Sequence, residues 1–433
     1  MSSLGNDPMG KDYEDYIAAN LQSTRRYYVE KNIERKNVLE LDIVTTNYSK
    51  EKPELKLWEI KSGNAVKNAK TNCEETEDPV IKCLFKVRGW MDYLGVKEGA
   101  YISKGNIGSL KKVKKVGKQL GIVVIDQVST TLVHDKLSLG NINQCDVEVW
   151  ECAYQTERKI IGHLQREKRD SNSHKKTKPY VNPLLNYYFQ VNNDIFFLGN
   201  NIERINSLFK TYSKREFRHI SARVGNVLCG GLFSDDVKVI PEQIYAKTYY
   251  GCECTDINVS TYIENRARLA ILKNAVDYIL NPDKSDENKL THTFKRRIKK
   301  LKNKTDPDSL KRYPIFWQWF LWVFGGFILE DYEDQEFALL SKKTGIPVAE
   351  IPNALRAYDI LFPLESGKEW LQLATQQKNI KLLSVFSVPF MGIGVKYRQS
   401  LYKEDPQVLK VLQSNKDLKK WADLSDKVLD GNC

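Results

Sequence analysis

Two stretches of the chain, VLELDIVTT (residues 38–46) and LWEIKSG (residues 57–63), decide the fold of its first part. Both are rich in β-branched and apolar residues, which is typical of β-strands. The segment between them, residues 47–53, is polar and ends in proline, and it predicts a hairpin loop. The two stretches are therefore expected to pair as neighbouring antiparallel strands.

Charged side chains interrupt both strands at particular positions. Because side chains alternate between the two faces of a strand, Asp42 lies opposite Ile43, while Glu59 and Lys61 share a face opposite Trp58. Hairpin pairing is expected to bring Asp42 close to Glu59. Two acids and one amine then converge near the end of the hairpin.

The surrounding sequence predicts a mixed sheet flanked by helices. Helical spacing of apolar residues covers residues 11–24, and Glu14 lies on that helix. The other expected elements are a short strand at 27–29, a helix at 80–94, a strand at 99–103, a basic amphipathic helix at 110–120 and an apolar strand at 122–125. The order αβββαβαβ indicates an α/β domain.

This set of side chains suits phosphodiester hydrolysis. The reaction needs an activated water and stabilisation of negative charge, and Mg²⁺ held by one or two carboxylates supplies both. We expect Asp42 and Glu59 to bind Mg²⁺, or Mn²⁺ in its place, with the main-chain carbonyl of Ile60 as a further ligand. Lys61 would polarise the attacking water or neutralise charge in the transition state.

The string from Glu40 to Val44, the sixteen residues between Asp42 and Glu59, and WEIKSG at 58–63 together resemble the PD-(D/E)XK nucleases, particularly Mrr-like restriction endonucleases and Holliday-junction resolvases. The resemblance covers roughly residues 8–130. It implies a restriction-endonuclease-like fold in which Asp42 and Glu59 bind metal, Lys61 is the catalytic lysine and Glu14 assists. It also implies a role in defence against foreign DNA. The chain has Leu41 where the family name places proline.

The bulk composition agrees with a folded protein that meets a polyanion. The 433 residues include 67 Lys and Arg against 55 Asp and Glu, a formal net charge of +12. The apolar stretch 315–329 is too short and interrupted for a membrane span, and it predicts a buried aromatic helix. With no signal peptide at the start and eight cysteines without zinc-ligand spacing, we expect a cytoplasmic protein with reduced thiols and no membrane partner.

Basic residues on three expected helices, at 80–94, 110–120 and 295–304, are candidates for contact with nucleic acid, with DNA expected more than RNA. Residues 295–304 form the densest basic run, with an apolar stripe at Phe294, Ile298 and Leu301, so a solvated helix that packs by this stripe is an equal alternative. The helix at 110–120 has the same ambiguity. The candidate contacts are Lys82, Lys86, Arg88, Arg296, Arg297, Lys299 and Lys300.

The rest of the chain predicts a mainly helical region. We expect a nuclease domain at 8–135, a connecting segment with a basic linker at 136–180, and a helical region at 181–433 for specificity, oligomerisation or sensing. The helical segments expected in this last region include residues 184–191, 202–212 and 262–280. Residues 337–361 resemble either a helix-turn-helix or an ordinary helical hairpin. The sequence leaves open a DNA-repair or RNA-directed nuclease, and a non-catalytic nucleic-acid-binding protein on the same scaffold.

Overall fold

In the computed structural model the chain forms two compact units, Met1–Gln155 and Thr156–Cys433. Each unit is described by itself. The structure describes residues 10–35, 39–63, 78–164, 206, 254–281, 290–362, 380–382 and 388–414.

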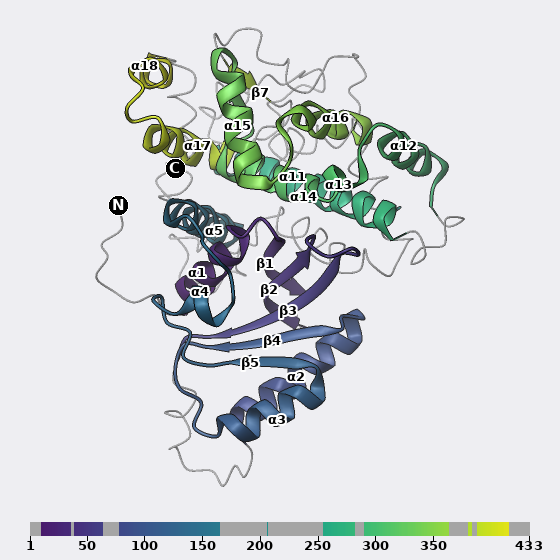
Figure 1. The fold of residues 1–433 in the computed structure, drawn as a ribbon, viewed down its shortest axis with the longest axis vertical. Helices are drawn as coiled ribbons and strands as arrows, with labels where there is room; N and C mark the ends of the chain where they lie inside the picture. Colours follow the sequence, from purple (N-terminus) through teal and green to yellow (C-terminus); the bar gives the residue numbers. More distant parts are fainter. Residues whose placement is uncertain are drawn as a thin grey trace, which may run out of the picture. The chain divides into compact units, whose positions relative to one another are not determined.

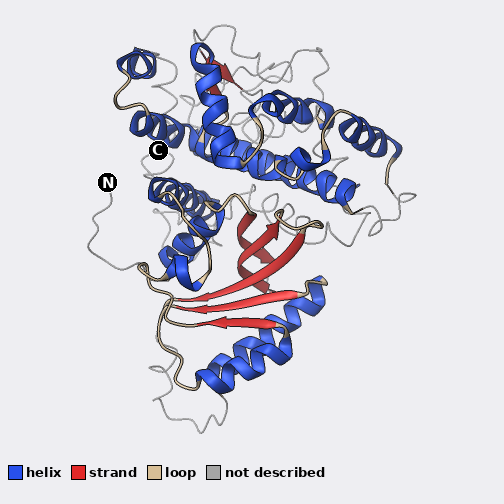
Figure 2. Ribbon diagram, in the orientation of Figure 1, coloured by secondary structure: helices blue, strands red, loops and turns tan. Residues whose placement is uncertain are grey.

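The first unit is built on a five-stranded mixed sheet with the order β1-β2-β3-β4-β5 (Figures 1 and 2). Strands β1, β2 and β3 pair antiparallel, and β3, β4 and β5 pair parallel. The strands are β1 (Tyr27–Arg35), β2 (Leu39–Asn47), β3 (Glu54–Lys61), β4 (Glu98–Ser103) and β5 (Ile122–Ile125). The helices are α1 (Lys11–Gln22), α2 (Pro79–Leu94), α3 (Leu110–Leu120), α4 (Val133–Lys136) and α5 (Gln144–Leu164). The expected mixed sheet flanked by helices is confirmed.

Strand β1 is three times as long as its sequence predicts. It pairs with β2 from Tyr27↔Asn47 to Arg35↔Leu39, although its second half is dominated by polar and charged residues. That half still has an apolar anchor at Ile33, which is fully buried, and a buried charge at Lys31. The amine of Lys31 forms an ion pair with Asp15 of α1, and both side chains are completely buried. A buried partner for the lysine therefore allows a strand where hydrophobicity alone predicts a loop.

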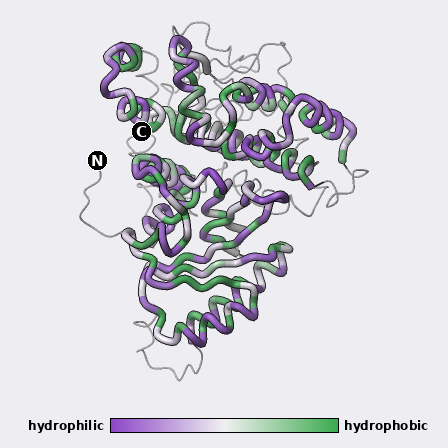
Figure 3. Tube along the Cα trace, in the orientation of Figure 1, coloured by the Kyte–Doolittle hydropathy of each residue, from purple (hydrophilic) through white to green (hydrophobic). Residues whose placement is uncertain are grey.

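Helices α2 and α3 pack on one face of the sheet, and α1 lies on the other. Two glycines allow this close approach: a Cβ at Gly99 of β4 would lie 2.7 Å from the sulfur of Met91 in α2, and one at Gly117 of α3 would lie 2.7 Å from the carbonyl of Ile122 in β5. Figure 3 shows hydrophobic and hydrophilic residues mixed along α2 and α3, as expected for helices with one buried side.

The second unit is mainly helical in its described residues, as expected. Its longest helix, α11 (Cys254–Leu280), contacts α14 and α17. The other α-helices are α12 (His292–Asn303), α13 (Pro307–Leu310), α14 (Tyr313–Gln318), α15 (Glu333–Thr344), α16 (Ile351–Leu361), α17 (Val388–Leu401) and α18 (Pro406–Ser414), and the short strands β6 (Phe327–Leu329) and β7 (Ile380–Leu382) pair antiparallel. None of the described helices combines the length and apolar character needed to cross a membrane.

The apolar stretch 315–329 is buried, but it is not the single helix that its composition predicts. Helix α14 passes into a π-helical turn, η4 (Trp319–Val323), and the chain then enters β6. Gly325 and Gly326, with φ of 71° and 75°, stop the helix because this left-handed backbone favours glycine.

Helix α16 packs against α12 of the same unit. Pro352 lies in the first turn of α16, where its missing N–H costs no hydrogen bond. Helix α16 buries Ala354 and Tyr358, and Trp317 donates a 3.0 Å hydrogen bond to the Ala354 carbonyl. One face of α16 is therefore occupied within its own unit, and contact of residues 337–361 with DNA stays a prediction.

The connecting segment expected at 136–180 contains helix α5 at 144–164, and the boundary between the two units falls within this helix. Residues 165–180, together with the helical segments expected at 184–191 and, apart from Asn206, at 202–212, lie outside the described part of the chain. The helix expected at 262–280 is confirmed as part of α11.

Candidate functional site

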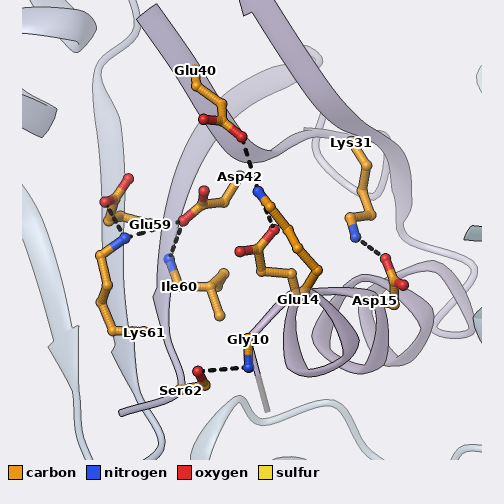
Figure 4. Close-up of polar contacts among 11 residues, drawn as sticks. Gly10, Glu14, Asp15, Lys31, Glu40, Asp42, Glu59, Ile60, Lys61 and Ser62 are labelled. Atoms are coloured by element: carbon orange, nitrogen blue, oxygen red, sulfur yellow. Dashed lines mark hydrogen bonds and ion pairs between the residues drawn. The ribbon is translucent and has the colours of Figure 1, made fainter. Parts of the chain in front are cut away.

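The hairpin of β2 and β3 opens at the point where its acidic residues begin. The paired register ends at Ile43↔Trp58, whereas β2 continues to pair with β1 as far as Leu39. Beyond that point the side chain of Asp42, instead of a main-chain carbonyl of β2, accepts a hydrogen bond from β3: its Oδ2 atom is 2.8 Å from the N–H nitrogen of Ile60 (Figure 4). The divergence of the strands therefore leaves room beside Asp42 while its carboxylate stays fixed.

Lys61 lies between the two acids, as the alternation of side chains predicts. Its Nζ atom is 2.5 Å from Oε1 of Glu59 and 3.6 Å from Oδ2 of Asp42. The two carboxylates are almost completely buried, with 9% of Asp42 and 4% of Glu59 exposed, while the side chain of Lys61 is 43% exposed. The amine therefore reaches from solvent into a pair of buried acids.

The electrostatics of Lys61 follow from this position. Burial lowers the pKa of Lys61, but the charges of Asp42 and Glu59 outweigh burial and raise it above its usual range. The amine is thus held in its charged form. Two carboxylates this close need a cation, and Lys61 supplies one.

Helix α1 brings Glu14 to the same place, as expected. Glu14 is buried, and burial followed by the nearby charge of Asp42 raises its pKa. Its Oε2 atom is 3.1 Å from Nζ of Lys11, which also lies 2.9 Å from Oε1 of Glu40. Glu40 therefore lies beside the acid cluster and forms an ion pair with Lys11 at the edge of that cluster.

Two contacts hold the start of α1 against the sheet. The N–H of Gly10 donates a 2.7 Å hydrogen bond to Oγ of Ser62, directly after β3. Five residues along, the buried pair of Asp15 and Lys31 joins α1 to β1 (Figure 4). Because Glu14 lies between these two anchors, its position beside Asp42 is determined by the packing of the helix.

Two residues at the site, Cys83 and Lys11, were not predicted from the sequence. The thiol of Cys83 in α2 donates a 3.4 Å hydrogen bond to Oε1 of Glu59, and burial together with the charge of Glu59 raises its pKa to about 12. Lys11 pairs with Glu14 and Glu40 from the first turn of α1. The helical spacing in the sequence fixes which face of α2 carries Cys83, but only the packing of α2 on β3 shows that this face meets Glu59.

The donor set fits a hard divalent cation, because Asp42 and Glu59 present carboxylate oxygens from adjacent strands. Both carboxylates already contact one positive charge, the amine of Lys61. Across the described ranges, no group of three or more His, Cys, Asp or Glu side chains is arranged to hold a metal ion. Two carboxylates plus water and substrate oxygens remain a suitable arrangement for Mg²⁺. Metal binding by Glu14 and by the carbonyl of Ile60 stays a prediction.

The candidate nucleic-acid contacts fall into two groups, one in each unit. In α2, Lys82 and Lys86 are exposed, and Arg88 donates to Asp92 and to the carbonyl of Leu120. Those three belong to the first unit.

In α12 of the second unit, Phe294, Ile298 and Leu301 are buried, so the apolar stripe packs as predicted. Arg296, Lys299 and Lys300 are exposed, and Arg297 donates a 2.6 Å hydrogen bond to the carbonyl of Leu361. Contact of either group with nucleic acid stays a prediction.

The chain matches no protein-family model, no curated protein and no solved structure. The function is therefore inferred from the geometry of the site.

Proposed function

We propose that this chain is a metal-dependent nuclease that hydrolyses phosphodiester bonds, with Asp42, Glu59 and Lys61 at its catalytic centre. One observation carries the proposal: two buried carboxylates from adjacent strands converge on one half-exposed lysine amine where the strands diverge. Acids that serve only solubility lie in water, and burial of two of them together is costly without a function or a compensating charge.

The side chains of the chain itself divide the work of hydrolysis. Asp42 is fixed by the N–H of Ile60, and Glu59 by the thiol of Cys83, so both carboxylates are oriented before substrate arrives. Lys61 carries a full positive charge at neutral pH and has access to solvent, so it can orient a water molecule and balance charge that develops on the phosphate.

Asp42 and Glu59 would hold Mg²⁺ or Mn²⁺, which when bound supplies Lewis acidity and lowers the pKa of a coordinated water. Glu14 supports this pair from α1: burial and the charge of Asp42 raise its pKa, and a divalent cation bound beside it would favour its ionised form. DNA is the substrate we propose, because the net charge of +12 favours a polyanion and the resemblance of the hairpin sequence favours DNA over RNA.

The test is cleavage of plasmid, linear and single-stranded DNA and of RNA by the full chain with Mg²⁺, Mn²⁺ or EDTA. Wild type should cleave only with the metals, and Asp42→Asn and Lys61→Met should lose about 10²-fold or more of the rate without unfolding. Lys56→Met is the matched control, because it removes one amine from the same strand away from the acid pair. Binding of nucleic acid without metal-dependent cleavage by wild type would instead indicate a non-catalytic scaffold.

A further inference from the structure

Helix α2 exposes two large aromatic rings along one stripe. Phe85 is 59% exposed and Tyr93 is 51% exposed. Together with Gly89 they follow an i, i+4, i+8 spacing, which places all three on nearly the same side of the helix. A Cβ at Gly89 would have no atom within 4 Å, so the space between the two rings is open. Single exposed apolar residues are ordinary, but here two exposed rings on one side of the helix flank the open space above Gly89.

Cations accompany these rings on the same helix. Lys82 and Lys86 are exposed, and Nζ of Lys86 lies 4.3 Å from the ring centre of Trp90, which is half-buried beside the stripe. The one exposed acid of α2, Asp92, already accepts two hydrogen bonds from Arg88. The exposed surface of α2 is therefore aromatic and positive.

Helix α3, which packs against α2, adds to this charge. It exposes five lysines and contains no acidic residue, and the exposed lysines are Lys111, Lys112, Lys114, Lys115 and Lys118. A second copy of the chain that met this face through a twofold axis would set lysines against lysines, because such an interface uses the same patch twice. A polyanion meets no such repulsion.

The aromatic stripe and the candidate catalytic centre lie on different sides of α2. Cys83 donates to Glu59, whereas Phe85, two residues further along, lies about 200° around a helix with 3.6 residues per turn. The stripe therefore faces away from β3, and binding there is separate from the candidate catalytic centre.

We propose that the surface formed by Phe85, Gly89, Tyr93 and Lys86 binds a single-stranded nucleic acid by stacking of unpaired bases. This binding does not depend on the proposed function. Aromatic rings and cations together are the chemistry that binds single strands without sequence preference. In a duplex, bases stack on each other and present only their edges in the grooves, so exposed rings at this surface select unpaired bases.

The spacing of the rings suits this partner. Eight residues of α-helix separate Phe85 from Tyr93 by about 12 Å along the axis. That is roughly three to four nucleotide steps at 3.4 Å each, so the two rings stack on different bases of one strand. Their contributions should therefore be close to additive, because the sites do not touch.

The test measures binding without cleavage. Fluorescence anisotropy of the full chain in EDTA compares labelled single-stranded DNA and RNA of about 15 nucleotides, the corresponding duplex, and an abasic strand with the same phosphates. Phe85→Ala and Tyr93→Ala should each weaken binding to both single strands by roughly 5- to 150-fold and leave binding to the abasic strand unchanged. Phe85→Tyr should retain wild-type affinity because the ring remains.

Val123→Ala and Leu132→Ala are matched controls, since each removes an exposed apolar side chain of the same unit away from α2. Equal losses in these controls, equal affinity for the base-containing and abasic strands, or tighter binding of the duplex would overturn the stacking surface. Base-dependent binding in a chain that cleaves nothing with any metal would uphold the stacking surface and refute the nuclease.

Discussion

Replacement of Lys61 by methionine should strengthen metal binding while it abolishes cleavage. The amine lies 2.5 Å from Glu59 and 3.6 Å from Asp42, so it occupies the space in which a bound cation would contact both carboxylates. A metal that binds Asp42 and Glu59 must first displace this amine. Methionine fills a similar volume without charge, and it leaves the two acids in need of a cation.

The size of this effect follows from the burial of the three groups. Exposed ion pairs contribute about 0.2–1 kcal/mol, and breaking a fully buried pair costs about 3–5 kcal/mol. The acids here are nearly buried, but the lysine side chain is 43% exposed, so solvent screening places the pair at about 1–2 kcal/mol. Release from this competition should tighten metal binding by roughly 5- to 30-fold.

Isothermal titration of the full chain with Mn²⁺ and with Mg²⁺ measures the affinity directly. Thermal melts at several metal concentrations give an independent value, because a ligand that binds the folded state raises its stability as concentration exceeds Kd. Lys56→Met controls for the loss of one positive charge from β3. Unchanged or weaker metal affinity in Lys61→Met would show that the amine does not compete for these oxygens, and would refute the arrangement.

Three further substitutions test the packing and electrostatics. Burial, followed by the charges of Asp15 and other nearby acids, raises the pKa of Glu151 from 4.5 to about 7, so the folded state loses stability as pH rises from 4.5 to 7. In urea melts, Glu151→Gln should therefore increase the free energy of unfolding by about 1–2 kcal/mol at pH 8, after allowance for solvent screening, and by almost nothing at pH 4. Arg398→Met should cost about 3–5 kcal/mol because the buried Glu336 loses its partner; a melt like wild type would contradict this. Gly117→Ala should cost about 1–3 kcal/mol by thermal melt, since its Cβ meets β5, and an unchanged melting temperature would exclude that contact.

Much of the first unit could be predicted from its sequence, because its pattern is local. The hairpin, the helices α2 and α3 and the apolar strand β5 follow from periodicity and turn residues. The length of β1 could not be predicted, because its second half is held by pairing with β2 and by the buried ion pair of Lys31 with Asp15. Such a partner is distant in sequence and leaves no local signal.

The same division holds in the second unit. The burial of residues 315–329 follows from their composition, but the change from helix to strand does not. Arg398 illustrates the reason: it is completely buried and donates to Glu336 and to the carbonyls of Phe324 and Phe327. A charged side chain in the core is stable only because the tertiary fold supplies every partner.

Alternation along two strands was enough to place Asp42, Glu59 and Lys61 on one face, because the period of two is a property of the backbone itself. What only the tertiary structure decided is the environment of that face: the divergence of β2 from β3, the burial of the acids, and the contact with Cys83 of α2. Desolvation and the approach of distant elements depend on how the whole unit packs. These long-range effects turn an acidic hairpin into a candidate site.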